Sequence, residues 1–557
     1  MRRIELKSLD TPIEERPWFK VWPSHLPRNL KYPHVPAWWI LERNLNHFGH
    51  KDAVIFIDYE DLHEIERLTY GELWQRANSL AMDLRELNVK KGDRVATLLP
   101  NSPALIVSYY GIWIAGASIT PCNAMAKEKE LEYQLTDSGA SLLIAAKDLS
   151  GLAIPVAERL GLKAILFPVD RSDRNISEKT AIFERRLFNS RRSASDSSID
   201  PAEDIAVLLY TGGTTGVPKG AMLTHRNIVA NTIQFAEWYA LEPGAETFIC
   251  TIPMSHSGGM TGVMNVPLYS GATLILMKRF IAEAVGKAIE KYRATRFFSV
   301  PTTYIAILNS AEARRCDFSS LKACRTNAAP LPIAVKESFD RWVGREILIE
   351  GYGLTETSPL THANPLTRAK GGSIGIPIPD TDCKIVDIET GEDLPIGREG
   401  ELVIRGPQLM KGYWNRPEET ALAMAGGWFH TGDVGRMDEE GYFYIHDRLK
   451  DMINSGGYKV WPREVEEVLY AHPKVFQATV VGCLDDYYGE IVKAFIVPKD
   501  EATKTISKEE IITFCKGRMS NYKVPRIIEF CDQLVMSSQG KVLRCLMRGT
   551  PRSAKSE

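Results

Sequence analysis

From Leu68 onward, short apolar runs alternate with segments in which apolar residues recur at helical spacing. Short apolar runs bounded by turn residues and separated by helix-length segments are typical of parallel strands covered by helices. The runs lie at residues 94–99, 141–145, 164–167, 205–209, 273–277, 296–300 and 347–350. The pattern therefore predicts βα units, a largely parallel sheet and the α/β fold class.

The C-terminal third has a different texture. After about residue 380, glycines separate short strand-like runs at residues 401–405 and 442–445. The final part of the chain predicts a separate small α+β unit, with strands near residues 491–497 and 526–530. Between these strands, a capping box opens at Ser507 and predicts a helix to about Met519.

Two other segments hold few core-forming residues. Residues 1–70 carry scattered Pro and Trp, which indicates an N-terminal segment wrapped over the body of the protein. Residues 170–201 are rich in Arg and Ser, and we interpret them as a surface linker. The longest apolar stretch, Ala104 to Ile119, is shorter than the roughly 20 residues that cross a bilayer, so it predicts a buried strand or helix.

Composition narrows the class of function. The 557 residues carry a formal net charge of −2, without the basic excess of a polyanion-binding protein, so we expect no nucleic-acid partner. The nine cysteines are scattered without CxxC spacing, which predicts reduced thiols rather than a zinc site or disulfides. The N-terminus is charged and lacks the apolar core of a signal peptide, so a cytoplasmic location is expected.

The strongest chemical signal directly follows the apolar run at residues 205–209. Its candidate ligand residues are Thr211, Gly212, Gly213, Thr214, Thr215, Gly216 and Lys219. Glycines let the backbone approach a phosphate, threonine hydroxyls and N–H groups donate to it, and Lys219 adds positive charge. The spacing differs from a Walker A motif, because Pro218 precedes the lysine and Gly220 follows it. The segment predicts a phosphate-binding loop, with a plain connector as the alternative.

A second segment, residues 350–357, directly follows another predicted strand. Tyr352 lies between two glycines, which leaves its aromatic face open to a base. Thr355 can donate to a phosphate, and the Glu356 carboxylate offers the oxygen ligands that Mg²⁺ prefers. Taken alone, the segment could equally be a strand-end turn that caps a helix.

Two shorter segments complete the pattern. Asp433 ends the run Gly427–Asp433 and can accept hydrogen bonds from two ribose hydroxyls. Lys541 follows a glycine near the C-terminus. Each would be a solvated turn or a surface lysine if it stood alone.

In this order, over residues 204–544, the four segments resemble the adenylate-forming superfamily of acyl-CoA synthetases, peptide-synthetase adenylation domains and beetle luciferases, with weaker similarity from about residue 68. The resemblance implies a large N-terminal AMP-binding domain, residues 1–449, built from two α/β subdomains and a β-barrel. A small, mobile α+β C-terminal domain, residues 451–557, would follow a hinge at Lys450.

The resemblance also implies roles for single residues. Catalytic roles fall to Lys541, Thr355 and His256, with His256 at the entrance between the acid site and a thiol channel. Nucleotide and CoA binding fall to Thr211, Gly212, Gly213, Thr214, Thr215, Gly216, Lys219, Ala328, Ala329, Glu350, Gly351, Tyr352, Gly353, Asp433, Arg448 and Gly457. In that assignment Tyr352 stacks on adenine, Asp433 and Arg448 hold the ribose, Thr355 contacts the α-phosphate, and Glu356 binds Mg²⁺. One departure is that Val535-Met536-Ser537 stand where the family usually has Pro-Lys-Thr.

The resemblance implies an acid-thiol ligase that uses ATP, Mg²⁺ and CoA. A carboxylic acid would become an acyl-adenylate with release of pyrophosphate, and transfer to CoA would give acyl-CoA and AMP. A medium- or long-chain fatty acid is favoured, because the expected acid pocket is apolar and uncharged. Its residues are Ile233, Phe235, Ala236, Tyr239, His256 to Met260, and Asn327 to Ala329.

Several alternatives stay open at this point. The enzyme could be an aryl- or short hydroxy-acid CoA ligase, or an acyl-AMP ligase that loads a carrier protein. A luciferase-like oxygenase and a non-catalytic nucleotide-binding protein are further alternatives. The partners expected are the small-molecule acid, ATP and CoA, with at most peripheral membrane contact, and the sequence also allows a homodimer.

Overall fold

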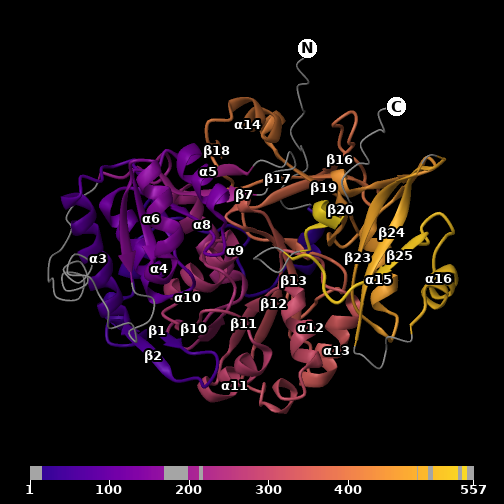
Figure 1. Ribbon diagram of the computed structural model, residues 1–557, viewed down its shortest axis with the longest axis horizontal. Helices are drawn as coiled ribbons and strands as arrows, with labels where there is room; N and C mark the ends of the chain where they lie inside the picture. The colour runs from indigo at the N-terminus through magenta and orange to yellow at the C-terminus, as the bar shows by residue number, and fades with distance from the viewer. Residues whose placement is uncertain are drawn as a thin grey trace.

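The computed structural model describes residues 16–167, 198–211, 218–485, 487–499, 506–536 and 542–547. Most of the expected linker at residues 170–201 therefore lies outside the described residues. The chain forms two large α/β sheets with their helices, a smaller antiparallel sheet, and a C-terminal α+β unit at the right of Figure 1.

One large sheet contains seven described strands in the order β18-β8-β7-β4-β3-β5-β6. The bounds are β3 (Arg94–Leu98), β4 (Ser118–Pro121), β5 (Leu142–Ala146), β6 (Lys163–Phe167), β7 (Ile205–Thr211), β8 (Lys219–Thr224) and β18 (Gly412–Tyr413). Strands β7, β4, β3, β5 and β6 are parallel, and β8 and β18 add an antiparallel edge. The accompanying helices are α3 (Tyr70–Glu86), α4 (Pro103–Ala115), α5 (Glu128–Ser138) and α6 (Ser150–Arg159).

The other large sheet contains nine described strands in the order β15-β14-β13-β12-β11-β9-β10-β1-β2. The bounds are β1 (Asp52–Ile57), β2 (Glu64–Thr69), β9 (Thr247–Cys250), β10 (Thr273–Met277), β11 (Arg296–Ser299), β12 (Ala323–Thr326), β13 (Leu348–Gly353), β14 (Leu360–Ala363) and β15 (Ile376–Pro377). Its helices are α8 (His225–Trp238), α9 (Ser257–Met260), α10 (Val266–Tyr269), α11 (Ala282–Tyr292), α12 (Pro301–Asn309) and α13 (Ile333–Val343). The strands from β1 to β13 in this order are parallel, as the apolar runs predicted.

Local sequence explains where the longest apolar stretch divides. Ser102 accepts the backbone N–H of Leu105 as the N-cap of α4, and Gly116 ends the helix with φ of 91°. The chain then enters β4, so the stretch is a buried helix followed by a buried strand. Among the described residues, no helix has the length and apolar character needed to span a membrane.

The segment before β1 lies against the body, as expected of an N-terminal wrap. It contains η2 (Pro17–Val21), α1 (Trp39–Glu42) and α2 (Leu45–Phe48). The backbone N–H of Ala37 donates to His225 Nδ1 at 3.0 Å, and the Asn44 amide donates to the Leu268 carbonyl at 2.6 Å. These bonds fasten the segment to α8 and α10.

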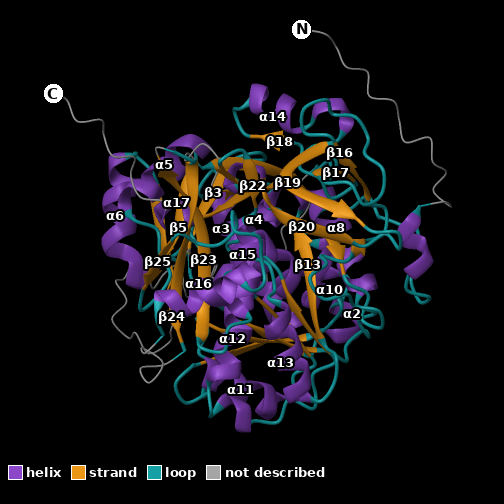
Figure 2. Cartoon of the chain, turned by 90° about the vertical axis from the view of Figure 1, so that its right-hand side faces the viewer, coloured by secondary structure: helices purple, strands orange, loops and turns teal. Residues whose placement is uncertain are grey.

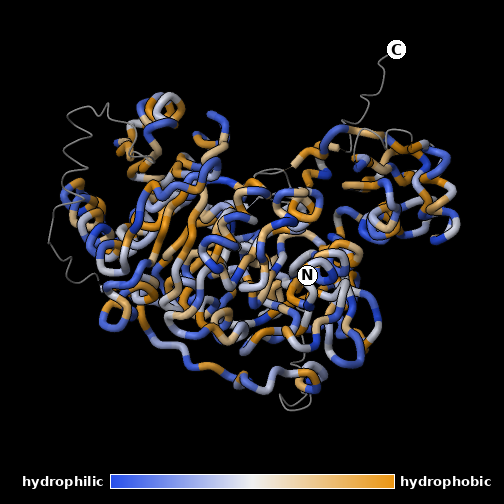
Figure 3. The backbone as a smooth tube through the Cα atoms, turned by 90° about the horizontal axis from the view of Figure 1, so that it is seen from below, coloured by the Kyte–Doolittle hydropathy of each residue, from blue (hydrophilic) through white to orange (hydrophobic). Residues whose placement is uncertain are grey.

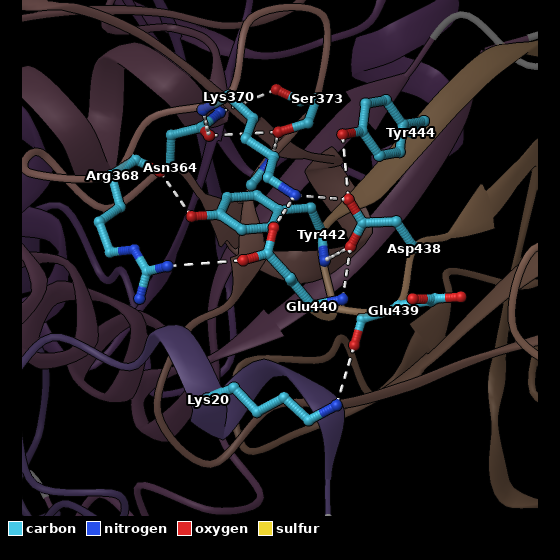
Figure 4. Close-up of polar contacts among 11 residues, drawn as sticks. Lys20, Asn364, Arg368, Lys370, Ser373, Asp438, Glu439, Glu440, Tyr442 and Tyr444 are labelled. Carbon is cyan, nitrogen blue, oxygen red and sulfur yellow. Dashed lines mark hydrogen bonds and ion pairs between the residues drawn. The ribbon is translucent and has the colours of Figure 1, made fainter.

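A third sheet occupies the place of the expected barrel. Four described antiparallel strands follow the order β16 (Asp382–Val386), β17 (Gly400–Arg405), β19 (Phe429–Met437) and β20 (Phe443–Arg448), and α14 (Pro417–Ala423) precedes β19. Figure 4 shows how the β19–β20 turn is anchored to the neighbouring loop. Lys370 donates to Asp438 at 2.8 Å and pairs with Glu440, while Tyr442 donates to the Arg368 carbonyl at 2.5 Å. This network fixes the hairpin whose far end carries Asp433 and Arg448.

The C-terminal unit has its own sheet and apolar cluster. Its elements are β21 (Ile453–Ser455), β22 (Tyr458–Val460), β23 (Val475–Asp485), β24 (Gly489–Pro498), β25 (Ile527–Phe530), α15 (Pro462–Tyr470), α16 (Lys508–Lys516) and α17 (Arg544–Met547). Figure 2 turns this unit toward the viewer, and Figure 3 shows hydrophobic stretches alternating with hydrophilic ones along the chain. The expected helix begins after Ser507, which caps it, but α16 ends at Lys516 because Gly517 follows, short of the predicted Met519.

The remaining short turns of helix join these units. They are η3 (Lys147–Leu149), η4 (Thr261–Asn265), η5 (Ala313–Arg315), η6 (Thr355–Thr357), η7 (Ala425–Gly427) and η8 (Leu449–Asp451). Helix η4 is a π-helical turn that joins α9 to α10.

Candidate active site

Three of the predicted nucleotide residues meet at the ends of β13, β19 and β20. Asp433 and Arg448 are direct register partners of the antiparallel pair β19–β20, and the Arg448 Nε lies 3.1 Å from Asp433 Oδ1. The Tyr352 hydroxyl donates to the other oxygen, Oδ2, at 2.5 Å. Asp433 is 3 % exposed, and its negative charge raises the pKa of the Arg448 guanidinium. One carboxylate thus joins an aromatic ring to a cation, although the residues lie far apart in sequence.

A second corner gathers around Tyr413, which the sequence analysis missed. The Tyr413 hydroxyl donates to Glu356 Oε1 at 2.8 Å, and its ring lies 5.4 Å from the Lys219 ammonium. Strand β18 brings Tyr413 there by pairing with β8, and Lys219 also forms an ion pair with Glu419 of α14. Tyr413 therefore links the predicted phosphate lysine to the predicted Mg²⁺ ligand.

The predicted phosphate loop is described only at its two ends. Thr211 and Lys219 are register partners of β7 and β8, so the intervening residues close a hairpin. Gly212, Gly213, Thr214, Thr215 and Gly216 lie outside the described residues.

The glycines of the second motif are required by close packing. A Cβ at Gly351 would lie 2.8 Å from Arg325 Nε, and a Cβ at Gly353 would overlap the Pro359 carbonyl. Strand β13 continues into η6, which carries Thr355 and Glu356. The geometry therefore needs glycine on both sides of Tyr352.

The Asn327–Ala329 segment and His256 approach each other beside β12. A Cβ at Gly258 of α9 would lie 3.4 Å from the Asn327 amide nitrogen, and His256 is the N-cap residue of that helix. Burial lowers the pKa of His256 to about 4, so its imidazole is neutral at physiological pH. Ala328 has φ of 70°, a left-handed conformation that costs a non-glycine residue about 1–2 kcal/mol.

A buried cation lies under this segment, and the sequence analysis missed it. Arg325 of β12 is 2 % exposed, and its guanidinium carbon lies 4.5 Å from the centre of the Phe235 ring. Burial lowers the pKa of this guanidinium. The residues expected to line the acid pocket are uncharged, but they pack beside this cation.

The C-terminal unit contacts the nucleotide strand through Glu350. Glu350 is 6 % exposed and lies 3.7 Å from the Arg463 guanidinium of α15. Burial raises the pKa of Glu350 to about 7, and Arg463 partly offsets that rise. Arg463 also donates to the Ile445 carbonyl at 2.6 Å, so it bridges β13 and β20. Its role could not be read from sequence, because it stands in an ordinary amphipathic helix.

The other predicted C-terminal residues differ in how far the structure describes them. Gly457 and Gly456, with φ of 86° and 60°, form the exposed two-residue turn between β21 and β22, as hairpins of this kind require. The Lys450 side chain and all of Lys541 lie outside the described residues. Arg544, three residues after Lys541, pairs with Asp447 at 2.8 Å and Glu466 at 2.7 Å.

Comparison with known families agrees with this geometry. The family model described as AMP-binding enzyme matches residues 41–414, and its companion, AMP-binding enzyme C-terminal domain, matches residues 464–541. The chain belongs to the AMP-binding enzyme family. The resemblance to the adenylate-forming superfamily, and the α/β fold class expected from it, are thereby confirmed.

Individual AMP-binding enzymes match over almost the whole chain. A long-chain-fatty-acid–CoA ligase from Bacillus subtilis (strain 168) is 40 % identical over 553 residues, covering 95 % of this chain and 97 % of its own. A feruloyl-CoA synthase from an Amycolatopsis species is 37 % identical over 480 residues, covering 86 % and 92 %. The solved structure of an anthranilate CoA ligase in complex with anthranoyl-AMP superposes with a TM-score of 0.83 at 27 % identity, covering 93 % and 97 %.

The eight cysteines whose side chains the structure describes are free thiols, in agreement with the sequence.

Proposed function

We propose that this protein is an AMP-forming acid–CoA ligase that activates a carboxylic acid, with fatty acids as the main class. The observation that carries the proposal is the cluster of Tyr352, Asp433 and Arg448 in a chain that matches a fatty-acid–CoA ligase end to end. The two chemical halves are adenylation of the acid and transfer of the acyl group to CoA.

ATP would bind along the edge where β13, β19 and β7 end. The Tyr352 ring offers a stacking face, and Asp433 can exchange its bond from Tyr352 for bonds from ribose hydroxyls. Lys219 and the loop that begins after Thr211 would hold the β- and γ-phosphates, and Thr355 would contact the α-phosphate.

The residues present fit a Mg²⁺ ion. Glu356 presents a carboxylate, a hard oxygen ligand, and its one printed side-chain bond comes from the neutral Tyr413 hydroxyl. When bound there, Mg²⁺ supplies charge neutralisation for the triphosphate. Tyr413 would orient the carboxylate, as hydrogen-bond partners of metal ligands commonly do.

The first half-reaction joins two anions, so its barrier is largely electrostatic. A carboxylate oxygen of the acid attacks the α-phosphorus, the bond to the bridging oxygen breaks, and pyrophosphate leaves with its electrons. Lys219, Arg448 and Lys541 supply positive charge to this step, and Lys541 is the residue we assign to the α-phosphate and the leaving oxygen. In the second half the thiol of CoA attacks the carbonyl carbon and AMP leaves.

The two halves need different neighbours around one acyl-adenylate. We assign residues 1–449 to the AMP-binding domain and residues 451–557 to a mobile domain that turns about Lys450 between the halves. The change of sheet between Arg448, the last residue of β20, and Ile453, the first of β21, supports this division. Gly457 and its turn would then reach the CoA arm, and His256 would stand between the acid and the thiol. We place the reaction in the cytoplasm, where ATP and CoA are available.

Product analysis tests the proposal. The purified protein, with ATP, Mg²⁺ and CoA, should form AMP and acyl-CoA in equal amounts with a linear carboxylic acid of some length between acetate and stearate. Formation of AMP without acyl-CoA would show that CoA is the wrong acceptor. Formation of ADP, or of no nucleotide product with any acid, would overturn the proposal.

A further inference from the structure

Two buried arginines on neighbouring strands differ in what surrounds them. Arg296 of β11 is 4 % exposed and forms two bonds, at 3.0 and 3.2 Å, with the fully buried carboxylate of Glu246. Arg325 of β12 is buried to the same degree, but no described carboxylate forms an ion pair with it. A buried cation without an anion is costly to folding, so such a residue calls for a functional reason.

The surroundings of Arg325 satisfy only part of its guanidinium. The Asn327 amide, with its oxygen turned toward Arg325, accepts one bond at 3.2 Å and donates to the Ser299 carbonyl at 3.3 Å. The Phe235 ring covers one face of the guanidinium. The Nε–H is buried and has no hydrogen-bond partner among the described residues.

A second buried donor lies in the same aromatic wall. Tyr239, at the end of α8, is 1 % exposed, and its hydroxyl has no hydrogen-bond partner among the described residues. Its ring packs at 5.2 Å from Phe235, the residue that covers Arg325. A polar group left unpaired at this depth costs about 1–3 kcal/mol, and two of them side by side indicate an acceptor that comes from outside the chain.

The position of this pair relates it to the proposed reaction. Arg325 lies directly under Gly351 of the nucleotide strand, and Asn327, which binds it, abuts Gly258 near His256. The tail of an acid whose carboxylate faces the α-phosphate would therefore lead inward toward Phe235, Tyr239 and Arg325.

From this geometry we infer that Arg325 and Tyr239 select acids whose tail carries an acceptor oxygen, such as a hydroxyl, a phenol or a second carboxylate. The inference rests on the proposed acid–CoA ligase function and narrows its substrate class. A purely alkyl tail would leave both donors unpaired, whereas an oxygenated tail would satisfy them.

Matched acid pairs test the inference in the full-length protein. Linear acids from butanoate to dodecanoate are compared with their ω-hydroxy and ω-carboxy derivatives, and cinnamate with its para-hydroxy derivative, by kcat/KM for acyl-CoA formation. In the unaltered protein, the oxygenated member of at least one pair should be favoured about tenfold or more.

Two variants then assign the preference to the side chains. Arg325→Met removes the cation with little change in volume, and should lower the oxygenated-to-plain ratio by about 10- to 100-fold. Tyr239→Phe removes only the hydroxyl, and should lower the same ratio by about 2- to 10-fold, so it keeps the test decisive if Arg325→Met does not fold.

The outcomes separate the two proposals. Plain acids preferred in every pair, or variants that slow all acids equally, would overturn the inference and leave the ligase function standing. AMP formation from no acid at all would overturn the ligase function, and the inference with it.

Discussion

Asp433 serves two partners in the structure, and its place between them explains why it is an aspartate. Its two oxygens bind Arg448 and Tyr352 separately, in a position that is almost fully buried. A glutamate would displace the contact atoms, and an amide could accept at only one of them. The residue therefore aligns the aromatic ring with the cation before any nucleotide arrives.

Asp433→Asn should raise the KM for ATP by about 10- to 100-fold, because the amide loses one acceptor and leaves Arg448 without its anion. The measurement is the initial rate of pyrophosphate release against ATP concentration. Tyr352→Phe is the matched control, since it keeps the ring and removes only the bond to Asp433, and should raise KM by less than about tenfold. An unchanged KM in Asp433→Asn would contradict the ribose assignment.

Glu350 predicts a pH dependence of stability. Burial raises its folded-state pKa to about 7, above the value of about 4.3 in the unfolded chain, so the folded state holds its proton more tightly. The stability from this proton is fully present below the unfolded pKa and is lost as pH rises through 7. The groups that face the carboxyl are Arg463, which opposes the rise, and Glu467, which adds to it.

Glu350→Gln should therefore gain melting temperature relative to the unaltered protein as pH rises from about 5 to about 8, by a few degrees. Thermal unfolding across that pH range measures the difference. Glu392→Gln, at an exposed position of the 391–397 loop, is the control and should show no such trend. A difference in melting temperature that does not change with pH would refute the raised pKa.

Among the elements, strand β13 has the least freedom to change. It pairs in parallel with β12 on one side and antiparallel with β14 on the other, and then turns into η6. Helix α8 is held to the same turn, because the Asn231 amide both donates to and accepts from Leu360. The nucleotide motif and the helix of the proposed acid pocket thus move as one piece.

Gly353→Ala should disrupt this element, because its new methyl group would overlap the Pro359 backbone, which has no side chain that could move aside. We expect a loss of roughly 2 kcal/mol or more in the free energy of unfolding and a corresponding fall in adenylation. Chemical denaturation and pyrophosphate release measure the two effects. Gly371→Ala, where the nearest atoms would lie 3.9 Å away, is the matched control and should stay within about 0.5 kcal/mol. Equal effects of both substitutions would contradict the packing argument.

For the molecule as a whole, the contacts between the C-terminal unit and the nucleotide sheets are few and polar. Arg463 contacts Glu350 and the Ile445 carbonyl, and the Ile333 N–H donates to Glu467 at 3.5 Å. Sparse polar contacts of this kind suit a unit that must leave one position and take another. They support the assignment of the two half-reactions to two arrangements of the chain.

Lys541→Ala should reduce adenylate formation by about 10²- to 10³-fold, since one charged donor to the transition state is lost. The reaction of a supplied acyl-adenylate with CoA should be largely unchanged. Pyrophosphate release measures the first half, and acyl-CoA formation from the adenylate measures the second. Lys516→Ala, at an exposed position at the end of α16, is the control and should alter neither half. An equal loss of both halves would contradict a role confined to adenylation.

The sequence by itself determined the family, the parallel strands and most of the nucleotide residues, because each is encoded in a contiguous run. Apolar runs predicted β3, β5 and β10 to within a residue of their ends. Glycine patterns predicted the turn at Gly456 and Gly457.

Only the tertiary structure decided what lies between those runs. Tyr413 reaches Glu356 because β18 joins the edge of β8, and Arg325 faces Phe235 because β12 packs under α8. Neither residue stands in a recognisable motif, and Arg296, with the same side chain and burial, is neutralised by Glu246. Whether a buried arginine is paired depends on strand order and register, which bring distant residues together and which a local pattern does not encode.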